Sequence, residues 1–171
     1  MSILKILQYP DLRLRTKARP VLDVKSPKIQ KIIKNMLKTL ANQENCSGLA
    51  STQLDIKDPP GITVINNPYN DEVICLVNPQ IIGSYGSTFS DEGCMSIAPE
   101  SIHAKVKRAT RIMVSALDLH GNQMTFEAKD YLACIIQHEC DHLEGILYID
   151  HLSESERKKI DKEIAKLPPK S

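Results

Sequence analysis

A histidine pair and a glutamate near the C-terminal end of the chain have the residue types and the spacing of a metal site. His138 and His142 are four residues apart, and Glu139 follows the first of them inside an apolar run. Residues four apart on a helix share one face, so both imidazoles can bind one ion while the glutamate reaches water beside it. Ordinary polar side chains on a half-buried helix are the weaker interpretation, because the surrounding run has the helical character that the chemistry requires. The pattern therefore predicts metal-assisted hydrolysis.

A catalytic metal ion usually has three protein ligands, so the histidine pair leaves one to be found. Downstream, Glu154 and Glu156 begin a surface helix, where capping and the helix dipole explain them, and Glu163 lies further along. Upstream, Cys94 directly follows Gly93 between strand-like segments, where the backbone can approach an ion closely. A thiolate with two imidazoles leaves the fourth position for water. Cys94 is the better candidate, and a zinc endopeptidase that uses Glu163 is the rival.

Length and composition limit the kinds of protein that this chain can be. Its 171 residues and 42% hydrophobic content predict a single catalytic domain over residues 1–171. The 22 Lys+Arg and 21 Asp+Glu give a formal charge of +1, which argues against a surface built for direct nucleic-acid readout. The sequence shows no membrane-spanning run, no secretion signal and no disulfide-framework spacing among its five cysteines. We expect a cytoplasmic protein with reduced thiols and no membrane contact.

Three helices are predicted to carry or cover the candidate site. Ser26 as an N-cap begins the first of them. The second runs over about residues 128–142 and carries both histidines. A capping box of Ser153 and Glu156 opens the third, over about residues 154–167. The apolar stripe of the first helix consists of Ile29, Ile32, Ile33, Met36, Leu37 and Leu40.

Strands are predicted for the central third, where β-rich runs are separated by Pro, Asn and Gly. The runs follow one another without intervening helices, so antiparallel pairing should dominate. A hairpin turn is expected at His120-Gly121-Asn122. The predicted fold class is α+β, with mainly antiparallel strands packed around a central metal-binding helix, an N-terminal helix and a C-terminal helix. The predicted strands are residues 62–65, 72–77, 111–117 and 123–127.

Three motifs, in order along the chain, resemble those of the peptide deformylase family. That family is marked by G-x-G-L-A-A-x-Q, then E-G-C-L-S, then Q-H-E-x-D-H-L-x-G. The resemblance also covers the N-terminal arm, where Tyr9-Pro10-Asp11 and Leu14-Arg15 are similar to the family's start, and it runs to about Leu152. The matching residues of the three motifs are Gly48, Leu49, Ala50, Gln53, Glu92, Gly93, Cys94, Ser96, Gln137, His138, Glu139, Asp141, His142, Leu143 and Gly145.

The resemblance implies an activity and a cofactor. Cys94, His138 and His142 would bind one divalent ion, with Fe(2+) expected first and Zn(2+), Ni(2+) or Co(2+) as alternatives. The implied reaction removes the N-formyl group from the N-terminal formylmethionine of nascent polypeptides, which are the expected partners, and releases formate.

The resemblance also implies roles for residues around the ion. Glu139 would accept a proton from water and return it to the departing amine. The Gln53 side-chain amide and the backbone N–H of Met95 would stabilise negative charge on the formyl oxygen. An ion pair of Glu92 and Arg108 would hold the loop that carries the cysteine.

Substrate contacts are where the chain departs from the family's pattern. Cys46 replaces a glycine, Ser47 a residue that is often aliphatic, and Ser51 an alanine, while the segment 97–107 is about two residues longer than usual. The alternative within this class is therefore a divergent deformylase-like hydrolase with a shifted or weak substrate preference. The expected substrate-binding residues are Gly48, Ser47, Gly93, Tyr131 and Cys134.

The third predicted helix carries five basic residues that could make a transient ribosome contact. Acidic residues alternate with them, so a solvated helix face is the favoured interpretation. The basic residues are Arg157, Lys158, Lys159, Lys162 and Lys166.

Overall fold

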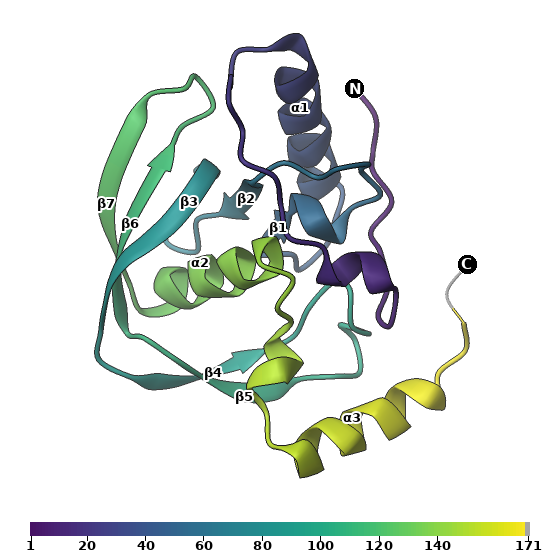
Figure 1. The fold of residues 1–171 in the computed structure, drawn as a ribbon. Coiled ribbons are helices and arrows are strands. Elements are labelled where there is room, and N and C mark those ends of the chain that lie inside the picture. The colour runs from purple at the N-terminus through teal and green to yellow at the C-terminus, as the bar shows by residue number, and fades with distance from the viewer. Residues whose placement is uncertain (170–171) are drawn as a thin grey trace.

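The computed structural model describes residues 1–169 and has the α+β architecture that the sequence predicts (Figure 1). The helices are α1 (Pro27–Ala41), α2 (Asp130–Leu143) and α3 (Glu154–Ala165), with short 3-10 helices η1 (Leu12–Arg15), η2 (Ser51–Gln53) and η3 (Tyr148–His151). The strands are β1 (Gly48–Ala50), β2 (Ile62–Asn66), β3 (Val73–Tyr85), β4 (Thr88–Glu92), β5 (Ala104–Arg108), β6 (Arg111–Leu117) and β7 (Gln123–Lys129). Within the described part of the chain, every helix is too short or too polar to cross a bilayer.

Among the described residues, the strands form two sheets in which neighbouring strands are antiparallel. The larger sheet has the order β1-β2-β3-β6-β7, and the smaller one consists of β4 and β5. The long strand β3 pairs first with β2 and then with β6, and its register with β6 shifts between Val77 and Gln80 and again between Ile81 and Gly83. Such irregularities increase the local twist and bend of a strand, which lets β3 curve around the helix beside it.

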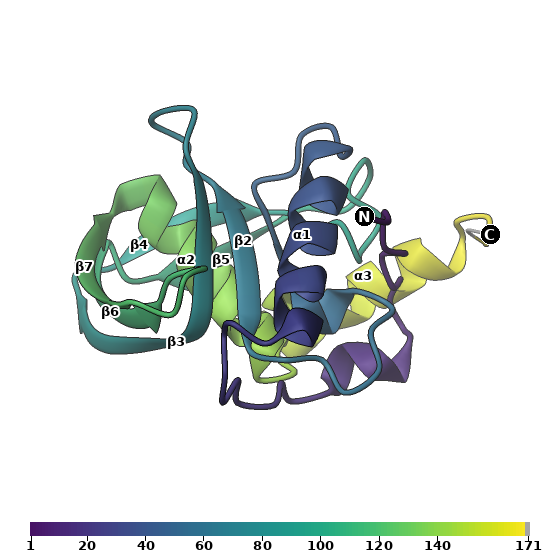
Figure 2. The ribbon, with the colours of Figure 1, turned by 90° about the horizontal axis from the view of Figure 1, so that it is seen from above.

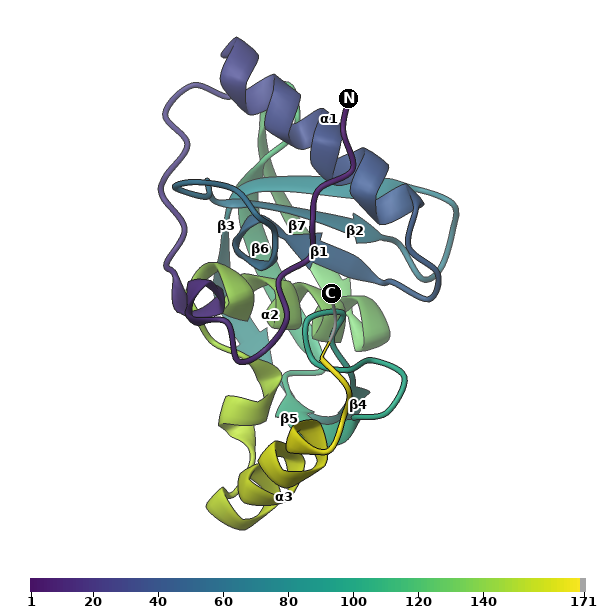
Figure 3. The same ribbon diagram turned by 90° about the vertical axis from the view of Figure 1, so that its right-hand side faces the viewer.

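Helices α1 and α2 cover opposite faces of the larger sheet (Figure 3). Alternate residues of β2 point to opposite sides, so Val64 packs in the cluster that contains Met36 of α1, and Ile65 packs in the cluster that contains Ile136 of α2. Helix α2 has apolar layers on both sides, and packing against them keeps it in the centre of the molecule. The metal-site residues predicted on it are therefore buried between the sheet and the rest of the protein.

A second apolar layer joins the smaller sheet to both ends of the chain. Val106 of β5 clusters with Leu7 and Leu14 of the N-terminal arm, with Tyr148 of η3 and with Ile160 of α3. Figure 2 shows α3 running along the side of the molecule where the N-terminal arm lies. The N-terminal arm thus helps to close the apolar core that β5 borders.

Most predicted elements are confirmed, with differences at their ends. The Ser26 side chain accepts a hydrogen bond from the Ile29 N–H at the start of α1, as expected for an N-cap. The second helix begins two residues later than predicted, because β7 continues through Lys129 and Asp130 opens α2. The pairing of β4 with β5 was missed, since Thr88–Glu92 is polar in pattern and its partner lies beyond a long loop.

Hydrogen bonds of the Asp150 side chain link η3 to the N-terminal arm and to α3. Its carboxylate accepts hydrogen bonds from both terminal nitrogens of Arg15, from Nη1 of Arg157 at 2.9 Å and from the Leu147 N–H at 2.9 Å. Burial raises the pKa of Asp150, but these partners outweigh burial and hold the pKa below its ordinary value.

We expect Asp150→Asn to lower the melting temperature at pH 7 by roughly 3–6 °C, equivalent to about 1–2 kcal/mol of lost charge-assisted hydrogen bonding. A lowered folded-state pKa means that this stabilisation is fully present above the unfolded value of about 3.9 and disappears as the pH falls through the folded value. Thermal unfolding of both proteins from pH 7 down to pH 3 measures the difference, which should shrink below about pH 4. Glu163→Gln, at an exposed carboxylate of α3, is the matched control and should change little. A difference that grew on acidification would contradict the assignment.

Candidate active site

Three side chains from distant parts of the sequence converge on one buried point. The Cys94 Sγ lies 3.3 Å from Nε2 of His142, and that nitrogen lies 3.1 Å from Nε2 of His138. One donor atom from each of the three residues falls within 4.8 Å of the others, and all three residues are buried. The structure therefore brings together the cysteine and both histidines that the sequence singled out.

The carboxylate of Glu163, the rival third ligand, is not in this group. It is exposed on α3, whereas both histidines and Cys94 are buried.

The surrounding elements explain why the three donors meet. Four-residue spacing on α2 places both imidazoles on one face of the helix, as predicted. Cys94 follows β4, and its loop is held by the N-terminal arm, because Gln8 Nε2 donates to the Met95 carbonyl at 3.0 Å and the Tyr9 N–H donates to the Ser96 carbonyl at 2.7 Å. The loop is thus anchored to a segment more than eighty residues away in sequence.

A buried ionic network orients His138. Its Nδ1 donates to Oε1 of Glu92 at 2.8 Å, which leaves Nε2 facing the other two donors. Arg108 donates hydrogen bonds to the same carboxylate from Nε and Nη2, each at 2.8 Å, and it donates from Nη1 to Asp141 at 2.7 Å. Burial raises the pKa of Glu92, but the bonds from Arg108 and His138 lower it to about 2. The carboxylate is therefore ionised and fixes the ring of His138.

Sequence reasoning foresaw the pair of Glu92 with Arg108 but gave no role to Asp141. Asp141 lies within the third motif, one residue before His142, and it bonds Arg108 on the side away from Glu92. It also bonds His151 of η3 at 2.8 Å. Its position between His138 and His142 in the motif was the available signal in the sequence. The sequence did not indicate that Arg108 would be its partner.

The donor set fits a divalent metal ion. One thiolate and two imidazoles are ligands of Zn(2+), Fe(2+) and related ions, and three protein ligands leave a position open for water or substrate. Burial lowers the pKa of His138, but hydrogen bonds to Cys94 and Glu92 outweigh burial and raise the pKa well above its ordinary value. Burial and the charge of His138 lower the pKa of His142. His142 therefore stays neutral, which is the form in which an imidazole binds a metal ion.

Glu139 lies beside the donors with one carboxylate oxygen free. It is 4% exposed, and its Oε2 has no hydrogen-bond partner among the described residues. Burial raises the pKa of Glu139 to about 7, although the neighbouring His138 lowers it. Gly48 of β1 makes room for it, because a Cβ at that position would lie 3.2 Å from both Cγ and Oε1 of Glu139. A free, buried carboxyl group near neutral pKa is suited to accept and return a proton.

The Gln53 side chain points its amide nitrogen at the donors. Its Oε1 accepts a hydrogen bond from the Ala50 N–H at 2.9 Å, which fixes the orientation of the amide. Nε2 then lies 3.5 Å from the Cys94 Sγ and donates to the Ser96 hydroxyl at 3.2 Å. The Met95 N–H, the other predicted donor, finds no hydrogen-bond acceptor within residues 1–169. The Gln53 amide is thus oriented so that a substrate oxygen could accept from it, and Met95 lines the cavity on the loop that carries Cys94.

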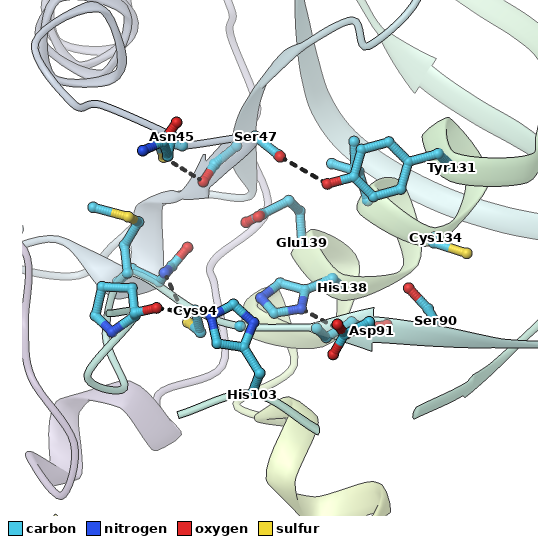
Figure 4. A pocket seen from close by; sticks show the side chains of 18 of the residues that line it. Asn45, Ser47, Ser90, Asp91, Cys94, His103, Tyr131, Cys134, His138 and Glu139 are labelled. Carbon is cyan, nitrogen blue, oxygen red and sulfur yellow. Dashed lines mark hydrogen bonds and ion pairs between the residues drawn. The ribbon is translucent and has the colours of Figure 1, made fainter. Parts of the chain in front are cut away.

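A cavity of about 500 Å³ opens beside the donors (Figure 4). All five predicted substrate-binding residues line it, from β1, from the Cys94 loop and from the first turns of α2. Ser90, Asp91 and His103 also line it and were not singled out from the sequence. The predicted residues that line the cavity are Ser47, Gly48, Gly93, Tyr131 and Cys134.

Cys46, which departs from the family's pattern, also lines the cavity. Its thiol donates to the Gly48 carbonyl at 3.3 Å, and burial followed by the charge of Glu139 raises its pKa to about 12. A thiol with so high a pKa is not a nucleophile at neutral pH. The hydrogen bond to Gly48 and the high pKa favour a structural role for Cys46.

We expect Arg108→Ala to weaken metal binding by roughly 10- to 100-fold, because it leaves Glu92 buried without its main partner and frees the ring of His138. Competition against a chelator, measured well below the melting temperature, gives the affinity. The control is Arg111→Ala, which removes an exposed guanidinium that pairs with Glu127. Equal metal affinity in Arg108→Ala and the unaltered protein would show that the network does not position the ligand.

Comparisons with known proteins agree with this geometry. The model of the family described as polypeptide deformylase matches residues 3–158. The chain is 46% identical over 164 residues to peptide deformylase 1 of Coxiella burnetii, with 95% of each chain covered, and 44% identical over 172 residues to a peptide deformylase of Buchnera aphidicola, with 100% and 96% covered. It is also similar to the crystal structure of the Ehrlichia chaffeensis peptide deformylase in complex with actinonin, at a TM-score of 0.87 and 31% identity over 97% of this chain and 98% of that one. A Legionella pneumophila peptide deformylase gives a TM-score of 0.84 and 32% identity over 98% and 100%.

Proposed function

The chain belongs to the peptide deformylase family, and on that premise we propose which of its residues carry out each part of the reaction. The protein is a metal-dependent hydrolase that removes the N-formyl group from the N-terminal formylmethionine of nascent polypeptides and releases formate. The observation that carries the residue assignment is the convergence of Cys94, His138 and His142 beside the buried carboxyl group of Glu139. A zinc endopeptidase that uses Glu163 is not supported.

The metal ion would be held by Cys94, His138 and His142. Fe(2+) is our first choice, and Zn(2+), Ni(2+) and Co(2+) suit the same donors. When bound, the ion supplies Lewis-acid chemistry, which lowers the pKa of water and polarises a carbonyl group. Glu92 keeps the His138 ring in the tautomer whose Nε2 is free to bind, because its carboxylate takes the proton on Nδ1.

Glu139 would move the proton. Its unpartnered Oε2 takes a proton from the attacking water as the new bond forms between the water oxygen and the formyl carbon. The carbon–nitrogen bond then breaks, and Glu139 delivers the proton to the departing amine, so that formate and a free N-terminus result. The raised pKa supports this role, because the group can both accept and release a proton near neutral pH.

Gln53 and the Met95 backbone would bind the formyl oxygen. Negative charge gathers on that oxygen as the carbon becomes tetrahedral, and preorganised N–H donors stabilise it. The Gln53 amide is preorganised by the Ala50 N–H, and it needs no rearrangement to donate toward the site. The Met95 N–H lies on the loop that also carries Cys94.

The substrate chain would lie in the cavity, against Ser47, Gly48, Gly93, Tyr131 and Cys134.

We also propose that residues 1–171 form a single catalytic domain, because Asp150 ties α3 to the arm, and Tyr9 of the arm donates from its hydroxyl to Asp161 of α3 at 2.9 Å. Nascent polypeptides are made in the cytoplasm, where we place the enzyme.

Formate release from formyl-Met-Ala-Ser by anaerobically prepared, iron-loaded protein tests the activity. We expect formate from this peptide and no acetate from the same peptide carrying an acetyl group. Failure to release formate from the formyl peptide would overturn the function.

A transient ribosome contact through α3 is a finer proposal. Two of its five basic residues are already paired within the chain, Arg157 with Asp150 and Lys158 with Glu154. The other three have no ion-pair partner among residues 1–169 and remain for an anionic partner, and we expect the contact to be weak and sensitive to salt. Co-sedimentation with ribosomes, with and without residues 153–171, measures it, and equal pelleting of both forms would rule it out.

A further inference from the structure

We propose that the enzyme also removes the formyl group from chains whose first residue is methionine sulfoxide, because its cavity presents hydrogen-bond donors to the first side chain. The inference rests on the proposed function and uses the same reaction: water's oxygen joins the formyl carbon, the carbon–nitrogen bond breaks, and the amine leaves with the proton. The two substrates differ only in the first side chain, methionine or methionine sulfoxide, which the cavity would bind.

The position of the reacting group tells which part of the cavity receives that side chain. The formyl carbon must lie among Cys94, Glu139 and Gln53. From there the cavity extends to Ser47, Tyr131, Ser90 and Cys134, which Figure 4 labels around Glu139 and His138. The first side chain branches one bond from the formylated nitrogen. The part of the cavity between these four residues, which we call the extension, is therefore the space nearest to the first side chain.

One wall of the extension is a pair of hydroxyl groups. The Ser47 Oγ and the Tyr131 hydroxyl lie 3.2 Å apart and bond to each other. One hydrogen suffices for that bond, so the other hydroxyl hydrogen is left to donate elsewhere, whichever group is the donor within the pair. The Tyr131 backbone N–H donates to the Tyr69 hydroxyl at 3.0 Å, which steadies the start of α2. The wall therefore offers a free donor at a fixed place.

A second pair of residues that line the extension also carries donors, and this pair is more deeply buried. Ser90 is 8% exposed and Cys134 is 5% exposed. Both side chains line the cavity, and burial raises the pKa of the Cys134 thiol, so the thiol keeps its proton at neutral pH. The Ser90 hydroxyl and the protonated thiol each carry a hydrogen that can be donated to a ligand.

The same cavity retains apolar surface for an unoxidised side chain. Ile135 and Met95 line it together with the four polar residues. Carboxylates of Glu44, Asp91 and Glu100 also line it, with all three residues exposed. Their charge disfavours an anionic first residue. The combination suits a neutral side chain of methionine's length, with or without a hydrogen-bond acceptor at the sulfur.

Methionine sulfoxide has that length and a strongly accepting oxygen. In a wholly apolar cavity this oxygen would lose its water without replacement, at a cost of roughly 10- to 100-fold in specificity. A hydroxyl donor facing it restores the bond. We therefore expect kcat/KM for formyl-Met(O)-Ala-Ser, with the better sulfoxide epimer, to lie within about tenfold of that for formyl-Met-Ala-Ser.

The test measures formate release from formyl-Met-Ala-Ser, from each sulfoxide epimer and from formyl-norleucine-Ala-Ser, which lacks an acceptor. In the variant S47A/Y131F/S90A we expect the sulfoxide-to-norleucine ratio of kcat/KM to fall at least about tenfold, the factor expected for a lost hydrogen bond. Because both peptides are measured on one protein sample, any loss of folded protein cancels in the ratio. Calorimetric binding of Met(O)-Ala-Ser and Met-Ala-Ser gives a second readout, in which the variant should lose affinity for the oxidised peptide selectively.

Tyr85→Phe is the matched control, because it removes an exposed hydroxyl from the end of β3 that does not line the cavity. We expect it to leave the ratio unchanged. If kcat/KM for both sulfoxide epimers were more than about tenfold below that for formyl-Met-Ala-Ser, the inference would be overturned and the deformylase activity would stand. An unchanged ratio in the triple variant would overturn it as well. If even formyl-Met-Ala-Ser released no formate, the proposed function would fail, and the inference with it.

Discussion

Replacing Glu139 by glutamine is expected to lower kcat/KM for formyl-Met-Ala-Ser by about 10²- to 10⁴-fold, while the protein still binds one metal ion. Glutamine has the size of glutamate, so it fits beneath Gly48 without crowding. It cannot take a proton from water at neutral pH, and the oxygen that is free in Glu139 loses its function as a base. Formate release and elemental analysis of the same sample separate the two effects.

The matched control is Glu144→Gln, which neutralises a carboxylate just beyond α2 that pairs with Lys17 at the surface. It should keep both activity and metal content. If Glu139→Gln lost its metal along with its activity, the glutamate would be acting as a ligand. If it kept full activity, another group would be the base.

Removing the Cys94 thiol is expected to have an equally large effect of a different kind. In Cys94→Ala the two histidines alone remain, and two ligands do not hold a divalent ion in a catalytic site. We expect metal content to fall from near one ion per chain to near zero, with formate release lost in parallel. Metal analysis after dialysis against metal-free buffer measures it.

Cys140→Ala is the matched control, because this thiol lies on α2 between the two histidines without joining the metal donors. Burial raises its pKa to about 12, so it remains a protonated thiol. The control should retain its metal. Retention of metal by Cys94→Ala would instead require a third ligand from elsewhere, such as Glu163, and would reopen the endopeptidase interpretation.

The fold was predictable where its causes are local in sequence. The N-cap at Ser26 and the apolar stripe of α1 fix where the helix starts and which side faces the sheet. The capping box of Ser153 with Glu156 likewise marks the start of α3. The pairing of β4 with β5 escaped prediction, because the strands are separated by the loop that carries Cys94 and neither shows a strong apolar alternation.

The candidate site likewise has a part that the local sequence predicted and a part that it did not. Four-residue spacing on a helix determined by itself that His138 and His142 share one face, and it predicted that they could bind one ion with Glu139 beside them. The motif order added Cys94, Gln53 and Met95, which the fold brings to the same point, although the roles given to them remain proposals.

Only the tertiary structure decided what surrounds these residues. Arg108 reaches Asp141 as well as Glu92, and Gly48 lies against Glu139 across two elements. The hydroxyls of Ser47 and Tyr131, eighty-four residues apart, meet at 3.2 Å. Such contacts depend on how the sheet, α2 and the arm pack against one another, and no local pattern encodes the meeting of two side chains from distant segments. The sequence therefore determined the chemistry at the metal, whereas the packing decided the polarity of the cavity that receives the substrate.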